Sequence, residues 1–125
     1  MMGTLWQVAL GGAIGAVARY ITTLAATRAL GAEFPYGTVI VNVLGSFAMG
    51  VLFVLLMERG LSRHAPLLLT GVLGGFTTFS AFSLETLVLV ERGHSGAAVL
   101  YVAASVGLSL LAVIGGLALA RGGFA

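Results

Sequence analysis

Four stretches without a charged residue constrain this chain more than any other feature of its sequence. They cover residues 1–18, 34–57, 65–84 and 95–120. A helix needs about 20 predominantly apolar residues to cross a bilayer, and each stretch approaches or exceeds that length. Charged residues make up 8% of the chain and hydrophobic ones 59%, whereas a soluble domain carries roughly 25% charged residues. We therefore expect the chain to fold in lipid.

Only helices satisfy their own backbone hydrogen bonds in lipid at this length and pattern. The sequence predicts one all-α membrane domain over residues 1–125, with transmembrane helices at about 4–28, 36–57, 65–91 and 96–120. The short connections make consecutive helices antiparallel neighbours. Polar residues and a glycine pair inside the third helix predict a break near its centre.

The basic residues are divided almost evenly between the two ends of such a bundle. Three arginines fall at one end, two at the other and one inside the first helix: Arg59, Arg63 and Arg121; Arg28 and Arg92; and Arg19. An excess of Arg and Lys on one side normally sets orientation, so this balance predicts dual topology. The alternative is a weak bias set by another factor. Dual topology in turn favours an antiparallel homodimer, because four helices alone enclose little space for a pore.

Several functional classes are excluded by what the sequence lacks. It has no cysteine, and its two histidines, His64 and His94, fall in loops. No Ser-His-Asp set, metal-ligand cluster or phosphate-binding glycine loop is present, so an enzyme is not expected. A scattered net charge of +2 argues against a nucleic-acid surface.

Asn42 stands in the middle of the second predicted helix, with Thr38 one turn earlier on the same face. Polar groups at membrane depth are costly and usually face a cavity or a partner. An asparagine amide offers two donors and one acceptor. It could therefore line a path, or it could form an interhelical hydrogen bond that only holds the bundle together.

The stretch GGFTTFSAF at residues 74–82 interrupts the third hydrophobic run. Glycine lacks the side chain that disfavours non-helical angles, so local unwinding could free carbonyl oxygens there. Unwound backbone is tolerated at this depth only when it is buried in protein or lines a cavity. Two such breaks facing each other would form an oxygen cage suited to a hard monovalent cation. An intact helix with a plain glycine contact is the alternative.

Two further patterns fit a path for an anion. Phe79 and Phe82 share a helix face, and phenyl rings carry positive edges. Tyr101, Ser105 and Ser109 place three hydroxyls on one stripe of the fourth helix. The alternatives are that the rings belong to the core and that the serines bond back to carbonyls of their own helix.

Taken together, these residues resemble the Fluc (CrcB) fluoride channel family over nearly the whole chain. The resemblance rests on GAVARY at 15–20, GTVIVNVLGSFAMG at 37–50, GGFTTFSAFSLE at 74–85, and the Tyr-Ser-Ser stripe. It implies a fluoride-selective channel that passively exports fluoride across the inner (plasma) membrane and protects the cytoplasm. It also implies an antiparallel, dual-topology homodimer with two pores, with lipid and fluoride as the other partners.

The resemblance also implies roles for single residues. Ring edges of the two phenylalanines would face the anion, Asn42 would donate to it and position the rings, and the hydroxyl stripe would form a polar track. The implied fluoride pathway comprises Thr38, Asn42, Phe79, Ser80, Phe82, Tyr101, Ser105 and Ser109.

A structural sodium ion is implied as well, held by backbone oxygens of Gly74 and Thr77 from both copies. Arg19 matches a buried arginine with a structural or vestibule role. One position departs from the family pattern, because Ala81 stands where a threonine is usual. Ser80 could supply the missing hydroxyl.

Two other functions compete with this interpretation. A small multidrug transporter also has four helices and dual topology, but it needs a central acid for proton exchange, and the first helix has none. Glu85 lies in the last part of the third predicted helix instead. The second rival is an accessory membrane subunit that transports nothing itself.

Overall fold

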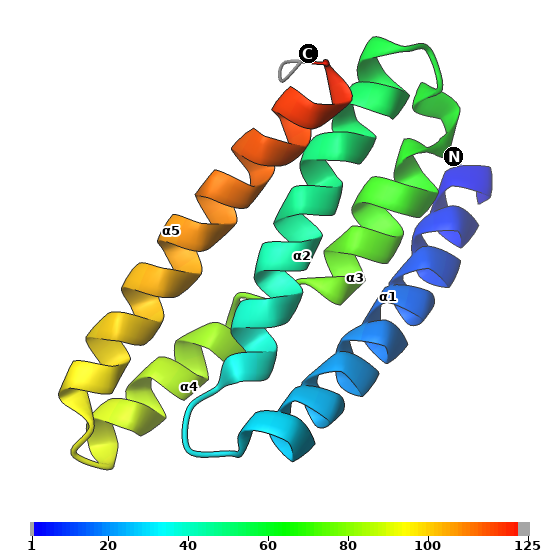
Figure 1. The fold of residues 1–125 in the computed structure, drawn as a ribbon. Helices are drawn as coiled ribbons and strands as arrows, with labels where there is room; N and C mark the ends of the chain where they lie inside the picture. Colours follow the sequence, from blue (N-terminus) through cyan, green and yellow to red (C-terminus); the bar gives the residue numbers. More distant parts are fainter. Residues whose placement is uncertain (1, 123–125) are drawn as a thin grey trace.

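The computed structural model describes residues 2–122, and within this range it consists of helices and short turns. Two elements are π-helical (η1 and η3) and one is a short 3₁₀ helix (η2). In chain order the elements are α1 (Met2–Leu30), α2 (Tyr36–Phe53), η1 (Val54–Glu58), η2 (Ser62–His64), η3 (Pro66–Leu73), α3 (Gly74–Phe76), α4 (Ser80–Glu91) and α5 (Ser95–Ala120) (Figure 1).

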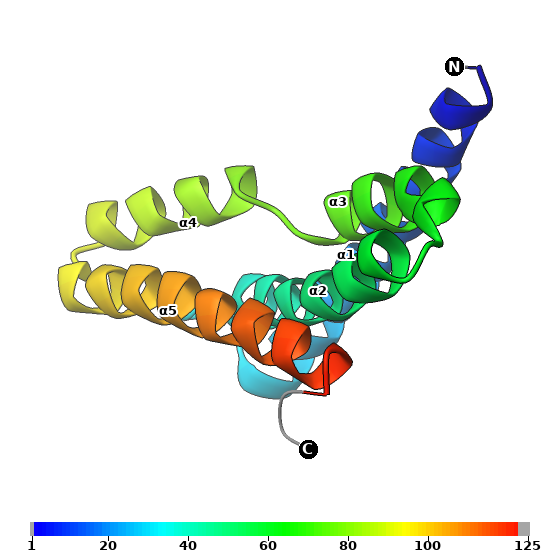
Figure 2. The same ribbon diagram turned by 90° about the horizontal axis from the view of Figure 1, so that it is seen from above.

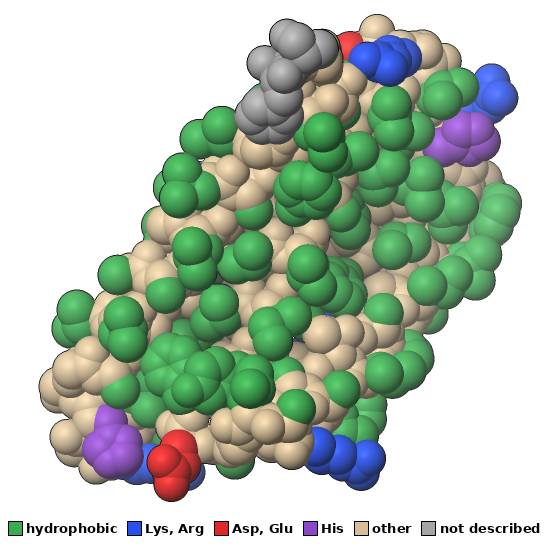
Figure 3. Space-filling view, in the orientation of Figure 1, with side chains coloured by type: hydrophobic (Ala, Val, Ile, Leu, Met, Phe, Trp, Pro, Cys, Tyr) green, Lys and Arg blue, Asp and Glu red, His purple; other side chains and the backbone are tan. Residues whose placement is uncertain are grey.

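Four helical segments are long and apolar enough to cross a membrane. They are Met2–Leu30, Tyr36–Glu58, Ser62–Glu91 and Ser95–Ala120. Hydrophobic side chains cover the body of the bundle and charged ones gather at its two ends (Figure 3). The all-α fold with four spans, expected from the charge-free stretches, is thereby confirmed.

The third span is two half-helices rather than one. Viewed from above, α4 lies along α5, whereas η3 and α3 lie beside α1 (Figure 2). Residues 77–79, which connect the two halves, belong to neither helix. Thr77 is extended, with φ −85° and ψ 162°. The helix expected over 65–91 is therefore broken near its centre.

The glycine pair before the break does not unwind, and in this detail the expectation from the sequence is wrong. Gly74 has helical angles, φ −61° and ψ −37°, and Gly75 is also helical. Gly75 serves packing instead, because a Cβ there would lie 2.6 Å from the carbonyl oxygen of Gly12. The extended angles of Thr77 are open to any residue.

α2 and α5 share the most extensive contact between any two elements of the described chain. They cross where Gly50 faces Gly116: a Cβ on Gly50 would lie 2.5 Å from the carbonyl oxygen of Val113, and one on Gly116 would collide with the carbonyl oxygen of Phe47. Small residues let membrane helices approach in this way. This crossing closes the space between α2 and α5 at one end.

Charged side chains fasten the chain beyond that crossing. Arg121 pairs with Glu58 at 2.5 Å, and Arg59 donates to the carbonyl oxygen of Ala120 at 2.6 Å. The hydrogen bond that Arg121 donates to the Glu58 carboxylate raises the pKa of the Arg121 guanidinium. The end of the second span is thus tied to the end of α5.

Candidate functional site

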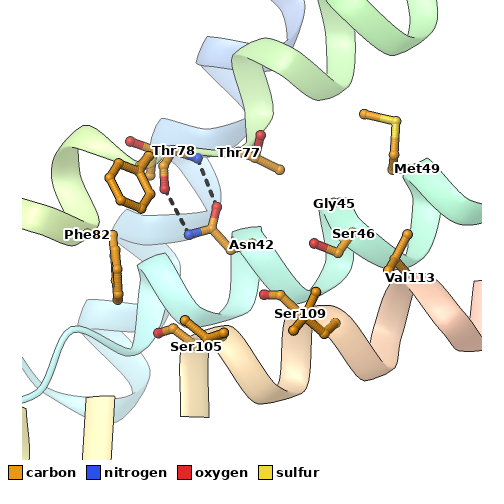
Figure 4. Close-up of a pocket in the computed structure, with 13 residues that line it drawn as sticks. Asn42, Gly45, Ser46, Met49, Thr77, Thr78, Phe82, Ser105, Ser109 and Val113 are labelled. Atoms are coloured by element: carbon orange, nitrogen blue, oxygen red, sulfur yellow. Dashed lines mark hydrogen bonds between the residues drawn. The ribbon is translucent and has the colours of Figure 1, made fainter. Parts of the chain in front are cut away.

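A crevice of about 400 Å³ lies between α2, the break in the third span and α5 (Figure 4). It brings together five of the eight residues of the expected fluoride pathway, namely Asn42, Phe79, Phe82, Ser105 and Ser109. The other lining residues are Gly45, Ser46, Met49, Thr77, Thr78, Val106, Leu110 and Val113. Asparagine, serine and threonine supply all of its polar side chains.

Asn42 clamps the break onto α2. The backbone N–H of Thr78 donates to Asn42 Oδ1 at 2.8 Å, and Asn42 Nδ2 donates to the Thr78 carbonyl at 2.9 Å (Figure 4). The neighbouring α2 residue must be small, because a Cβ on Gly45 would overlap the Thr77 side chain. The clamp uses the acceptor and one donor of the amide, so a second donor hydrogen of Asn42 is left for a ligand.

The hydroxyls of Ser105 and Ser109 are buried, and neither has a hydrogen-bond partner within the described chain. The alternative that they bond back to their own helix does not hold for these two residues. Hydroxyls elsewhere in the spans do so, at 2.8 to 3.0 Å: Thr22, Thr77, Ser83 and Thr86. A buried hydroxyl without a partner costs about 1–3 kcal/mol. Two of them facing one crevice are therefore well placed to bind a ligand.

The two phenylalanines lie differently from each other. Their ring centroids are 5.6 Å apart and their planes are tilted by 51°. Phe82 packs into the small core around Tyr101, at 5.1 Å between centroids. Phe79 is 76% exposed, so within one chain it is not a core residue. Both rings line the crevice and can turn positive edges toward an anion.

Thr38 and Tyr101 do not line the crevice, although the sequence suggested them for the pathway. Both are buried, and both donate to the same oxygen of Glu85: Thr38 Oγ1 at 2.6 Å and Tyr101 Oη at 2.9 Å. Their hydroxyl hydrogens are thus used within the protein. Sequence analysis missed Glu85 as a partner, although an acid well inside a predicted span needs hydrogen-bond donors.

Ser80 also lies apart from the crevice lining. It is exposed, and its hydroxyl is 3.5 Å from that of Thr78. Thr78 Oγ1 accepts the backbone N–H of Ala81 at 3.2 Å and so supports the first turn of α4. Thr78 and Ser46 are crevice residues that the sequence analysis did not identify as part of the site.

The break frees backbone oxygens that could hold a cation. The Thr78 N–H donates to Asn42, so the carbonyl of Gly74 loses its usual helical partner. In the same way the Ala81 N–H donates to a hydroxyl in place of the carbonyl of Thr77.

The neighbouring carbonyl, that of Gly75, is taken by Arg19 Nε at 3.1 Å, which gives this arginine a structural contact. Among residues 2–122 there is no group of three or more His, Asp or Glu side chains that could hold a metal. Carbonyl oxygens such as those of Gly74 and Thr77 are the kind of ligand that a hard monovalent cation takes when further oxygens complete its shell.

Comparison with known proteins places these features in a family. Residues 6–117 match the sequence model described as "CrcB-like protein, Camphor Resistance (CrcB)". Relatives that carry the name "Fluoride-specific ion channel FluC" include the following two. One, from Cereibacter sphaeroides, is 58% identical over 122 residues, 98% of each chain. The other, from Paracoccus denitrificans, is 56% identical over 125 residues and covers both chains completely.

Proposed function

The chain belongs to the CrcB-like family, and we propose that it is a fluoride-selective channel of the inner membrane. It is a multi-pass membrane protein, and its family is one of ion channels rather than enzymes. Fluoride would leave the cell passively, driven by the membrane potential and its own gradient. No ATP or proton coupling is expected.

The observation that carries this proposal is the donor set of the crevice. The hydroxyls of Ser105 and Ser109 have no partner, and Asn42 keeps one donor hydrogen beyond its clamp. Fluoride is small and strongly hydrated, so a selective path must replace its water with donors. These groups and the two ring edges are suited to that task.

The neutrality of these donors favours conduction over tight binding. Within residues 2–122, no arginine or other charged residue lines the crevice. Conduction requires binding strong enough for an ion to enter and weak enough for it to leave. Neutral hydroxyl, amide and ring-edge donors meet both conditions.

We further infer an antiparallel homodimer with dual topology and two pores. The large exposed ring of Phe79 supports a second copy that covers this side of the crevice. The arginines are divided between the two ends of the bundle, as described above, and such a balance favours insertion both ways up. A second copy in the opposite orientation would contribute its own phenylalanines to each path.

We also propose that sodium sits between the two copies. The freed carbonyls of Gly74 and Thr77 supply two oxygens from one chain, and an inverted copy would supply two more. When bound, the ion would hold the two breaks together by electrostatic attraction to their carbonyl dipoles. Arg19 would fix the neighbouring carbonyl of Gly75 and keep it out of the ion's shell.

The decisive experiment is efflux from proteoliposomes loaded with potassium fluoride or potassium chloride, started by valinomycin. The proposal predicts rapid fluoride efflux, with chloride efflux close to that of protein-free vesicles. Equal permeation of chloride would refute selectivity. Absence of efflux would favour an accessory subunit, and proton-coupled uptake of an aromatic cation without fluoride efflux would favour a multidrug transporter.

A further inference from the structure

The crevice changes character at one end. Along α2 its lining runs from Asn42 through Ser46 to Met49, and along α5 from Ser105 through Ser109 to Val113. In each row the last residue is apolar, and Val106 and Leu110 line the crevice beside the two serines of α5. Figure 4 shows Met49 on α2 and Val113 on α5, both at the end of the crevice away from Phe82 and Asn42.

The apolar end lies at a fixed point of the fold. Directly beyond it, α2 and α5 cross in backbone contact at Gly50 and Gly116, so a path toward that end has to leave the space between these two helices at this point. The chain then runs on from α2 to Arg59, which contacts the end of α5. Met49 and Val113 therefore lie between the two serines and the end of the bundle that carries Arg59 and Arg121.

We propose that Met49 and Val113 form an apolar collar, which an anion must pass to move between that end and the serine hydroxyls. This inference rests on the proposed function. The valine offers no hydrogen bond and the methionine only a weak acceptor, so an ion at the collar loses water without compensation. The collar is thus a barrier on the fluoride path, separate from the donor groups.

The two residues contribute to the barrier in different ways. Val113 is stiff at χ1 because it is β-branched, so its main effect is to present methyl groups where a donor could stand. Met49 is unbranched and flexible, so it fills the remaining width of the path and limits the size of the ion. Val113 therefore determines how well an ion is solvated at the collar, and Met49 determines how wide the path is there.

Two variants separate these properties. Val113→Thr keeps the shape and adds one hydroxyl at the collar. A hydrogen bond to an ion is stronger than a neutral one, so fluoride efflux should rise by roughly three- to tenfold, with the fluoride-to-chloride ratio unchanged or higher. Met49→Ala widens the path, and the ratio should fall by about tenfold or more, because the larger chloride gains access.

Matched changes outside the crevice serve as controls. Val99→Thr makes the same substitution at an exposed position of α5, and Met57→Ala does so at an exposed position of η1. Neither residue lines the crevice, so both variants should match the wild type in rate and ratio. Efflux is normalised to the folded dimer, and the ion ratio does not depend on protein yield.

The collar is overturned if the wild-type protein conducts fluoride but either collar variant gives the same efflux rate and ion ratio as its control variant. Slower fluoride efflux in Val113→Thr would overturn it as well. If Val113→Thr does not fold, Met49→Ala decides alone through the ion ratio. A wild-type protein that moves no fluoride would instead refute the proposed function.

Discussion

Asn42 offers the sharpest test, because it could hold the fold together, serve the ion, or do both. Two variants distinguish these roles. Asn42→Ala removes both hydrogen bonds to Thr78, whereas Asn42→Asp keeps the acceptor for the Thr78 N–H and loses the donor to its carbonyl. The aspartate also puts a carboxylate into the crevice at almost unchanged volume.

The expected losses of stability follow from the bonds that are removed. Each hydrogen bond contributes about 1 kcal/mol net, and a group left without a partner adds to the cost. Asn42→Ala should therefore lower the free energy of unfolding by about 2–4 kcal/mol, and Asn42→Asp by about half as much. If the residue were only glue, the alanine variant would also be the worse channel.

Fluoride efflux should show the opposite order. Repulsion between a carboxylate and an anion about 4 Å away amounts to about 4 kcal/mol in a partly solvated site. A barrier of that size slows passage by about a thousandfold. Per folded dimer, Asn42→Asp should thus be the poorer channel although it is the more stable variant.

Equilibrium unfolding in mixed micelles gives the stabilities, and the proteoliposome assay gives efflux for the same preparations. Efflux from both variants in proportion to the remaining folded protein would assign Asn42 a purely structural role. An alanine variant as stable as the wild type would refute the clamp itself.

Three further outcomes are expected. Phe82→Ala should lower fluoride efflux by about tenfold or more with the dimer intact on size-exclusion chromatography, because one ring edge is lost; unchanged efflux would remove the ring-edge argument. Ser105→Ala should slow efflux by about tenfold, whereas Ser83→Ala, whose hydroxyl already bonds to the Phe79 carbonyl, should not; equal effects would show that the free hydroxyl is unimportant. Replacing sodium with N-methylglucamine should shift the dimer toward monomer, and an indifferent dimer would exclude an ion at Gly74 and Thr77.

The four spans could be predicted because composition decides the solvent of this chain. Long runs without charge leave no alternative to lipid, and a helix is the element that satisfies its backbone there. Most of the arginines and glutamates lie near the turns, whereas Arg19 and Glu85 lie inside spans. No contact between distant residues is needed for this conclusion.

The position of the break depends on a contact that the sequence does not display. Thr78 pairs with Asn42, a residue 36 positions away, and this pairing holds the non-helical segment at residues 77–79. The glycine pair lies next to the break, but both glycines are helical. Gly75 is needed where the third span touches α1 at Gly12, and this requirement has no link to unwinding.

The hydroxyl pattern was only partly readable for a similar reason. A stripe of Tyr101, Ser105 and Ser109 follows from helical spacing, but spacing does not say where each hydroxyl hydrogen points. Tyr101 donates to Glu85, and so does Thr38, whereas the two serines keep their donors free. The structure therefore divides one stripe into a tyrosine that is bonded to Glu85 and two serines that line the crevice.

The placement of full charges explains how the same chain could attract an anion and still release it. Arg59 and Arg121 lie at one end of the bundle, and both bind groups of the protein there. Arg19, which lies well inside the first span, donates to Gly75 and is not among the described residues that line the crevice. A guanidinium about 4 Å from the ion would add about 4 kcal/mol of attraction and slow its release about a thousandfold. In the proposed channel, arginines at the ends would raise the local anion concentration and neutral donors would carry the ion between them, so attraction and passage would fall to different residues.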